Sequence, residues 1–116
     1  MSKQTEKLES EDKMRAVINR KRYDTNTADK IADWSNGHNR SDFYFFEETL
    51  CRTKVGAWFI HGEGGALSAY ATRTTNSSGW GEEITPLDES EALQWCQDHG
   101  AVDVIDKYFG ELVTDA

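Results

Sequence analysis

The chain has 116 residues, of which 37% are hydrophobic, 11% aromatic and 29% charged, and its formal net charge at pH 7 is -8. This length predicts one domain, and this composition excludes an intrinsically disordered chain. No apolar run approaches the roughly 18 residues that span a bilayer, and no signal-peptide pattern is present. We therefore expect a soluble cytoplasmic protein with no membrane partner.

The first predicted elements are a flexible segment, a hairpin and a helix. Residues 1–13 are polar and predict a flexible N-terminal segment, which leaves residues 14–116 as a single domain. Residues 16–23 predict a hairpin whose turn has Asn19 at positive φ. Residues 25–35 carry apolar and small side chains at helical spacing and precede an Asn-Gly terminator, which predicts a helix.

The middle of the chain predicts antiparallel strands. Residues 43–52 have the content of a strand, but two alternations compete, so we expect a bulge near Glu47-Glu48. A glycine turn joins this strand to residues 57–61, and residues 67–73 alternate as a third strand. Residues 83–85 predict a short edge strand that ends at the only proline of the chain.

The strongest local signal is a helix start at Asp88. Asp88 is placed as the N-cap, Glu91 completes a capping box, and Leu87 precedes the cap as a hydrophobic staple. This helix ends at Gly100, and residues 102–109 predict a second short helix. The predicted fold is α+β, an antiparallel β-meander of about four or five strands with helices packed on one face.

Two cysteines leave two alternatives open. The simplest prediction for Cys51 and Cys96 is that they are small buried thiols that need no disulfide, metal or cofactor. The alternative is a Cys2His2 zinc site that adds His61 and His99, although only Cys96 and His99 form a closely spaced ligand pair.

Two enzyme signatures are weak. The run His61-Gly62-Glu63-Gly64-Gly65 is similar to an esterase oxyanion loop, but no nucleophile motif accompanies it, and a wide hairpin loop explains it better. Glu47 or Glu48 with Glu63 would supply a glycosidase-like carboxylate pair, whereas carboxylates that guard an edge strand are commoner. The sequence therefore favours a protein that is not an enzyme.

Charge is segregated along the chain, and this predicts a binding surface. Residues 1–54 carry 11 Lys+Arg and 10 Asp+Glu, whereas residues 55–116 carry 2 and 11, a net charge of -9. Such a half disfavours direct nucleic-acid binding and favours a basic protein surface, with aromatic residues as anchors. The expected partner-binding residues are Glu63, Trp80, Glu82, Glu83, Asp88, Glu89 and Glu91.

Two blocks of the chain carry a resemblance. The runs NRKRYDTNTADKIADWSNG and EETLCRTKVGAWFIHGEGGALSAYA resemble a family of small acidic proteins of bacterial mobile elements and prophages, similar to anti-CRISPR inhibitors. The resemblance implies a phage or mobile-element inhibitor that binds a CRISPR-type effector through its acidic C-terminal surface, as a monomer or small homodimer. The alternative is an intracellular, non-catalytic module, either an accessory or interaction module or a metal-stabilised domain.

Overall fold

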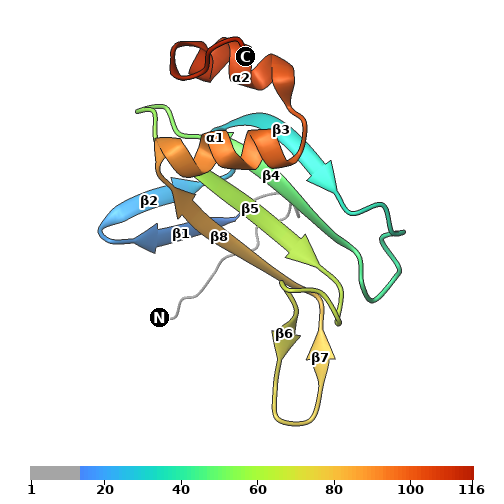
Figure 1. Cartoon of the computed structure of the whole chain (residues 1–116). Helices are drawn as coiled ribbons and strands as arrows, with labels where there is room; N and C mark the ends of the chain where they lie inside the picture. The colour runs from blue at the N-terminus through green and yellow to red at the C-terminus, as the bar shows by residue number, and fades with distance from the viewer. Residues whose placement is uncertain (1–13) are drawn as a thin grey trace.

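A four-stranded antiparallel sheet organises the computed structural model, which describes residues 14–116 (Figure 1). The flexible segment predicted for residues 1–13 lies outside the described residues. The strand order is β3-β4-β5-β8. The strands are β3 (Asp29–Ser35), β4 (Phe46–Arg52), β5 (Trp58–Gly64) and β8 (Gly81–Leu87). The predicted α+β class is confirmed.

The β4–β5 hairpin sets the register of the sheet. Its turn has Gly56 at φ +94°, a left-handed conformation that glycine adopts without steric cost. Pairing outward from this turn places Thr49 opposite His61 and Glu47 opposite Glu63. Because side chains alternate between the two faces of a strand, these four side chains share one face of the sheet.

Two helices cover the other face, as predicted (Figure 1). Helix α1 (Glu89–Asp98) begins at the predicted capping box, in which the Asp88 carboxylate accepts from the Glu91 amide at 2.8 Å and the Glu91 carboxylate accepts from the Asp88 amide at 2.8 Å. Helix α2 (Val102–Phe109) follows Gly100 at φ +69° and runs into the 3-10 turn η1 (Gly110–Leu112). The core between helices and sheet consists of Leu50, Trp58, Ile60, Ala92, Trp95, Cys96 and Phe109.

A second hairpin covers part of the opposite face. Strands β1 (Arg15–Ile18) and β2 (Lys21–Asp24) pair around Asn19 at φ 53° and Arg20 at φ 69°, which confirms the predicted turn. Its core contacts with the sheet involve Met14, Tyr23, Cys51, Phe59 and Ile84. The hairpin leaves the rest of this face uncovered.

The predicted helix over residues 25–35 is wrong, because its C-terminal part is strand β3. Ala28, Ile31, Ala32 and Ser35 satisfy helical spacing, but Ala32 and Trp34 also alternate as strand residues, and both pack toward the helix side of the sheet. Pairing with β4 satisfies the backbone hydrogen bonds of this segment, and tertiary pairing overrides a weak local pattern.

The irregularities of the sheet also differ from the sequence prediction. The predicted bulge at Glu47-Glu48 is wrong, because β4 pairs with β5 without interruption and the register shift lies in β3, between Lys30 and Ala32. The edge strand β8 extends to Leu87 and includes Pro86, since an edge strand has one side on which a missing amide hydrogen costs nothing.

The strand predicted over residues 67–73 is reduced to β6 (Thr72–Arg73), which pairs only with β7 (Ser78–Gly79) in a separate two-stranded hairpin. Turns occupy residues 67–70, where Ser68 accepts and donates local hydrogen bonds. Strand β8 therefore takes the place next to β5. In residues 14–116 no helix is long and apolar enough to cross a membrane.

Candidate functional site

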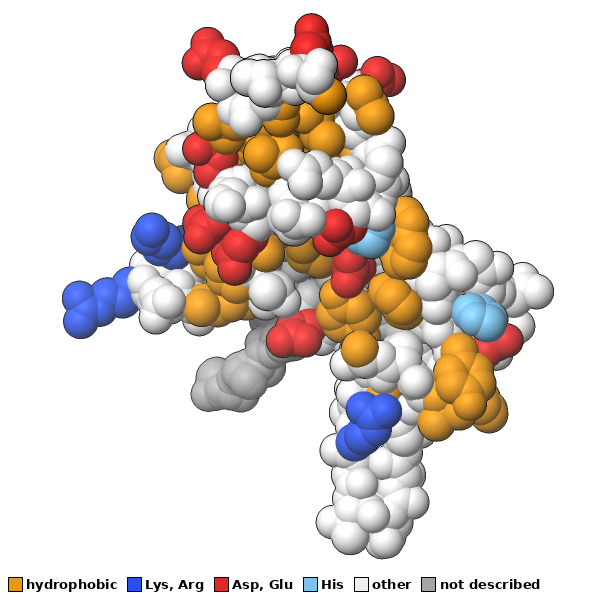
Figure 2. Space-filling view, in the orientation of Figure 1, with side chains coloured by type: hydrophobic (Ala, Val, Ile, Leu, Met, Phe, Trp, Pro, Cys, Tyr) orange, Lys and Arg blue, Asp and Glu red, His pale blue; other side chains and the backbone are white. Residues whose placement is uncertain are grey.

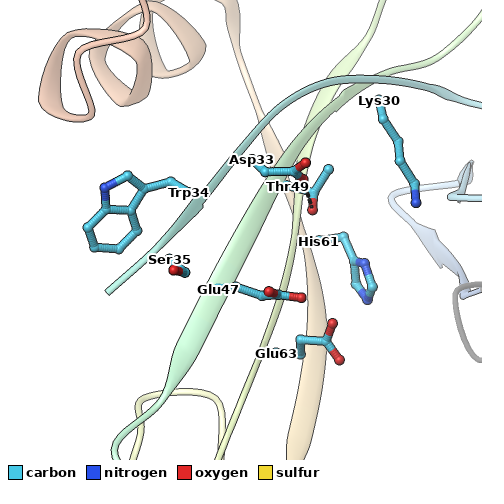
Figure 3. A pocket seen from close by; sticks show the side chains of 8 residues that line it. All are labelled: Lys30, Asp33, Trp34, Ser35, Glu47, Thr49, His61 and Glu63. Carbon is cyan, nitrogen blue, oxygen red and sulfur yellow. Dashed lines mark hydrogen bonds between the residues drawn. The ribbon is translucent and has the colours of Figure 1, made fainter. Parts of the chain in front are cut away.

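A polar cleft of about 480 Å³ lies on the sheet face that the β1–β2 hairpin leaves uncovered (Figure 3). Three neighbouring strands line it because their side chains alternate in register. The lining residues are Lys30, Asp33, Trp34 and Ser35 from β3, Glu47 and Thr49 from β4, and His61 and Glu63 from β5, although the Trp34 side chain points to the helix side of the sheet. Figure 3 shows Lys30 toward one end of the cleft and Glu47 and Glu63 at the other.

Glu47 and Glu63 form a carboxyl pair at one end of the cleft. Burial and then the hydrogen bond with Glu47 raise the pKa of Glu63, while His61 and Arg40 act in the opposite direction. A hydrogen bond between two carboxyl groups requires a proton on one of them. The folded state therefore favours the protonated form of Glu63.

The guanidinium of Arg40 binds this pair from outside the cleft. Its Nη1 lies 3.1 Å from Glu47 Oε2 and its Nη2 lies 3.8 Å from Glu63 Oε1. The same guanidinium lies 4.9 Å from the ring centroid of Trp80 and 5.4 Å from that of Phe45. One group thus makes cation–π and charge-assisted contacts, which shows that the carboxyl pair accepts a guanidinium.

Two further polar contacts hold the centre of the cleft. His61 Nε2 lies 2.9 Å from Glu82 Oε1, and both side chains are largely buried. The Thr49 hydroxyl donates to Asp33 Oδ1 at 2.8 Å. These contacts fix the orientation of His61 and Asp33, so the cleft is preorganised rather than formed by free side chains.

Glu48 lies on the opposite face from Glu47, beneath the helices. Its carboxylate accepts from Tyr70 Oη at 2.5 Å and from Trp95 Nε1 at 2.7 Å, and His99 Nε2 lies 3.8 Å away. His99 stacks on Trp34 with ring centroids 4.3 Å apart. Burial, followed by the contact with Glu48, raises the pKa of Tyr70. This cluster joins β3, β4 and α1.

Exposed carboxylates surround the two helices and form the second candidate surface (Figure 2). We define the acidic helical layer as the exposed residues Glu83, Asp88, Glu89, Glu91, Asp98, Asp103, Asp106 and Glu111. Lys107 is the only lysine or arginine in residues 83–112, so this layer carries eight acidic groups against one basic group.

The seven predicted partner-binding residues do not form one patch. Four of them belong to the acidic helical layer, namely Glu83, Asp88, Glu89 and Glu91. Glu63 lines the cleft, and the Glu82 carboxylate contacts the His61 ring. Trp80 is 40% exposed and stacks on Phe45 at the start of β8. Strand β8 separates it from the helix start by about 20 Å.

The alternative zinc set is not assembled. Cys51 packs in the core on the hairpin side of the sheet and Cys96 in the core on the helix side, so the sheet separates them. His61 is in the cleft and His99 lies against Trp34 and Trp95. Burial raises the pKa of Cys51 to about 11 and also raises that of Cys96, which keeps both as thiols at neutral pH.

Four residues of this site were not predicted from the sequence: Lys30, Asp33, Arg40 and Thr49. Counting outward from the predicted glycine turn would have paired Thr49 with His61 and Glu47 with Glu63, so this half of the cleft had a signal in the sequence. No sequence signal placed Lys30 and Asp33 at the cleft, because residues 25–35 were expected to form a helix.

A scan against protein-family models finds no match, and searches of curated proteins and of solved structures find no significant similarity.

Proposed function

We propose that this protein binds a basic surface of another protein through the acidic helical layer, and that it thereby excludes nucleic acid from that surface. The observation that supports this proposal is that residues 83–112 carry eight exposed carboxylates against one lysine, Lys107. Such a surface attracts a groove lined with Lys and Arg and repels nucleic acid itself.

The layer is rigid enough to present its charges in a fixed arrangement. Ala92, Trp95 and Phe109 anchor the two helices on the sheet, and the capping box holds Asp88 and Glu91. Preorganised charges lose less conformational entropy on binding than charges on a disordered tail. This supports a folded binding surface rather than an acidic solubilising tail.

The resemblance described above makes a CRISPR-type effector the first partner to test. Such a protein holds its guide and target strands in a positively charged channel. In this proposal the protein is a non-catalytic inhibitor carried by a phage or mobile element, acting as a monomer or small homodimer in the cytoplasm. Trp80 lies at the far end of β8, so binding by the layer does not require it.

The test neutralises the layer without breaking the helix cap. The variant Glu83→Gln, Glu89→Gln, Asp106→Asn and Glu111→Gln removes four charges and leaves Asp88 and Glu91 intact. Binding to a guide-loaded, DNA-free CRISPR-type effector is measured at about 50 and 500 mM salt, between which the Debye length falls from roughly 14 to 4 Å. We expect the variant to lose about tenfold or more in affinity at low salt and much less at high salt.

Two controls accompany this measurement. Asp29→Asn removes one exposed carboxylate that pairs with Lys54 outside the layer, and neutralising Arg20, Lys21 and Arg22 changes charge on the opposite pole. Neither should weaken binding more than about twofold, because neither touches the layer. Binding that is indifferent to salt, or equal for the layer variant and the unmodified protein, contradicts the proposal.

A further inference from the structure

The polar cleft holds its charges in a definite order along its length. Lys30 lies toward one end, Asp33 in the middle beside Thr49, and the Glu47–Glu63 pair at the other end (Figure 3). Residues that follow each other on one face of a strand are about 7 Å apart. Along its length the cleft therefore presents a positive group, then a negative group, then a second negative group.

The ammonium of Lys30 is available to a ligand. It makes no hydrogen bond or ion pair with any of residues 14–116, although Asp33 lies on the same face of the same strand. A ligand carboxylate at this end of the cleft would meet one unpaired cation.

The carboxyl pair at the other end accepts a basic group. Arg40 already contacts both carboxylates from outside, so two carboxyl groups face a single guanidinium. The cleft side of the pair, which Arg40 does not line, is open to a second cation. A cation there would favour the ionised form of Glu63.

The geometry points to the cleft as a binding site for a basic α-amino acid, with its α-carboxylate at Lys30, its α-ammonium at Asp33 and its side-chain cation at Glu47 and Glu63. The three ligand charges then each face an opposite charge. A volume of about 480 Å³ accommodates such a molecule. This site is on the sheet face opposite the acidic helical layer and is independent of the function proposed above.

Matched ligands test this inference without any change to the protein. Binding of L-arginine to the full chain is followed by amide chemical shifts of Thr49, His61 and Glu63, up to about 20 mM, which nearly saturates a site with a Kd of about 1 mM. L-Citrulline replaces the guanidinium by a neutral group of the same shape, and agmatine lacks the α-carboxylate. We expect each to bind about tenfold or more weakly than L-arginine, because each leaves one charged group of the cleft unpaired.

Two variants assign the ends of the ligand. Lys30→Met should abolish the difference between L-arginine and agmatine, and Glu47→Gln with Glu63→Gln should abolish the difference between L-arginine and L-citrulline. Asp29→Asn, on the same strand but outside the cleft, should change neither difference.

Proton release gives a further readout. Calorimetry of L-arginine binding in two buffers of different ionisation enthalpy should show proton release when the pH is near the raised pKa of Glu63. The other titratable or charged groups at or near this end of the cleft are Glu47, His61, Glu82, Arg40 and Asp33. The inference is overturned if L-arginine causes no shifts at the cleft, or if L-citrulline and agmatine bind as well as L-arginine.

Discussion

The Tyr70 ring packs directly against the backbone of Gly62 on the helix side of the sheet, and a substitution at Gly62 tests this packing. A Cβ placed on Gly62 would lie 2.0 Å from Tyr70 Cζ and 2.3 Å from Tyr70 Oη, distances that no side chain tolerates. Gly62 is in strand β5 and its φ is not positive, so the backbone itself accepts alanine. The Tyr70 ring is therefore the main obstacle to Gly62→Ala.

The expected loss of stability follows from the contact that the Tyr70 ring loses when it moves. If the ring moves away, its hydroxyl loses the 2.5 Å hydrogen bond to Glu48, and a hydrogen bond to a charged group contributes about 1.5–3 kcal/mol. Residual overpacking adds to this, so we expect Gly62→Ala to lower the free energy of unfolding by about 2–4 kcal/mol.

A double-mutant cycle separates the clash from other effects. In a Tyr70→Ala background the obstacle is absent, and alanine is better than glycine in a strand by about 0.5–1 kcal/mol. Gly62→Ala should then be neutral or slightly stabilising, which gives a coupling energy of about 2 kcal/mol or more between the two positions. Urea unfolding of the four proteins measures it, and an equal cost of Gly62→Ala in both backgrounds refutes the packing argument.

The other predictions concern the helix cap and the carboxyl pair. Asp88→Ala should lower the free energy of unfolding by about 1 kcal/mol, because the Glu91 amide loses its acceptor, and Leu87→Ala should add to this; an unchanged urea midpoint for Asp88→Ala would show that the cap contributes nothing. The raised pKa of Glu63 means that the folded state favours its protonated form, so its contribution to stability is present below the ordinary carboxyl range and is lost as pH rises through the raised pKa. Glu63→Gln removes this dependence, so the urea midpoint of the variant should rise relative to that of the unmodified protein as pH increases above 4.5, the ordinary carboxyl value. A difference in midpoint that stays constant with pH contradicts the raised pKa of Glu63.

Features encoded over a few residues could be predicted from the sequence alone. The capping box at Asp88, the positive-φ turn at Asn19, the glycine turn before β5 and the end of α1 at Gly100 depend on local backbone geometry, and the structure confirms each of them. The α+β class also followed from the order of these local signals. The segregation of charge was equally visible, because it is a property of composition.

Tertiary pairing decided what local patterns left ambiguous. Residues 25–35 fit a helix by spacing, but pairing with β4 makes residues 29–35 a strand, and only that pairing brings Lys30 and Asp33 to the cleft. Strand β8 displaced the predicted strand at residues 67–73 from the sheet by pairing along the whole of β5. Because neighbouring residues of a strand point to opposite faces, the same pairing put Glu47 in the cleft and Glu48 beneath the helices, a division that depends on register and not on the identity of either residue.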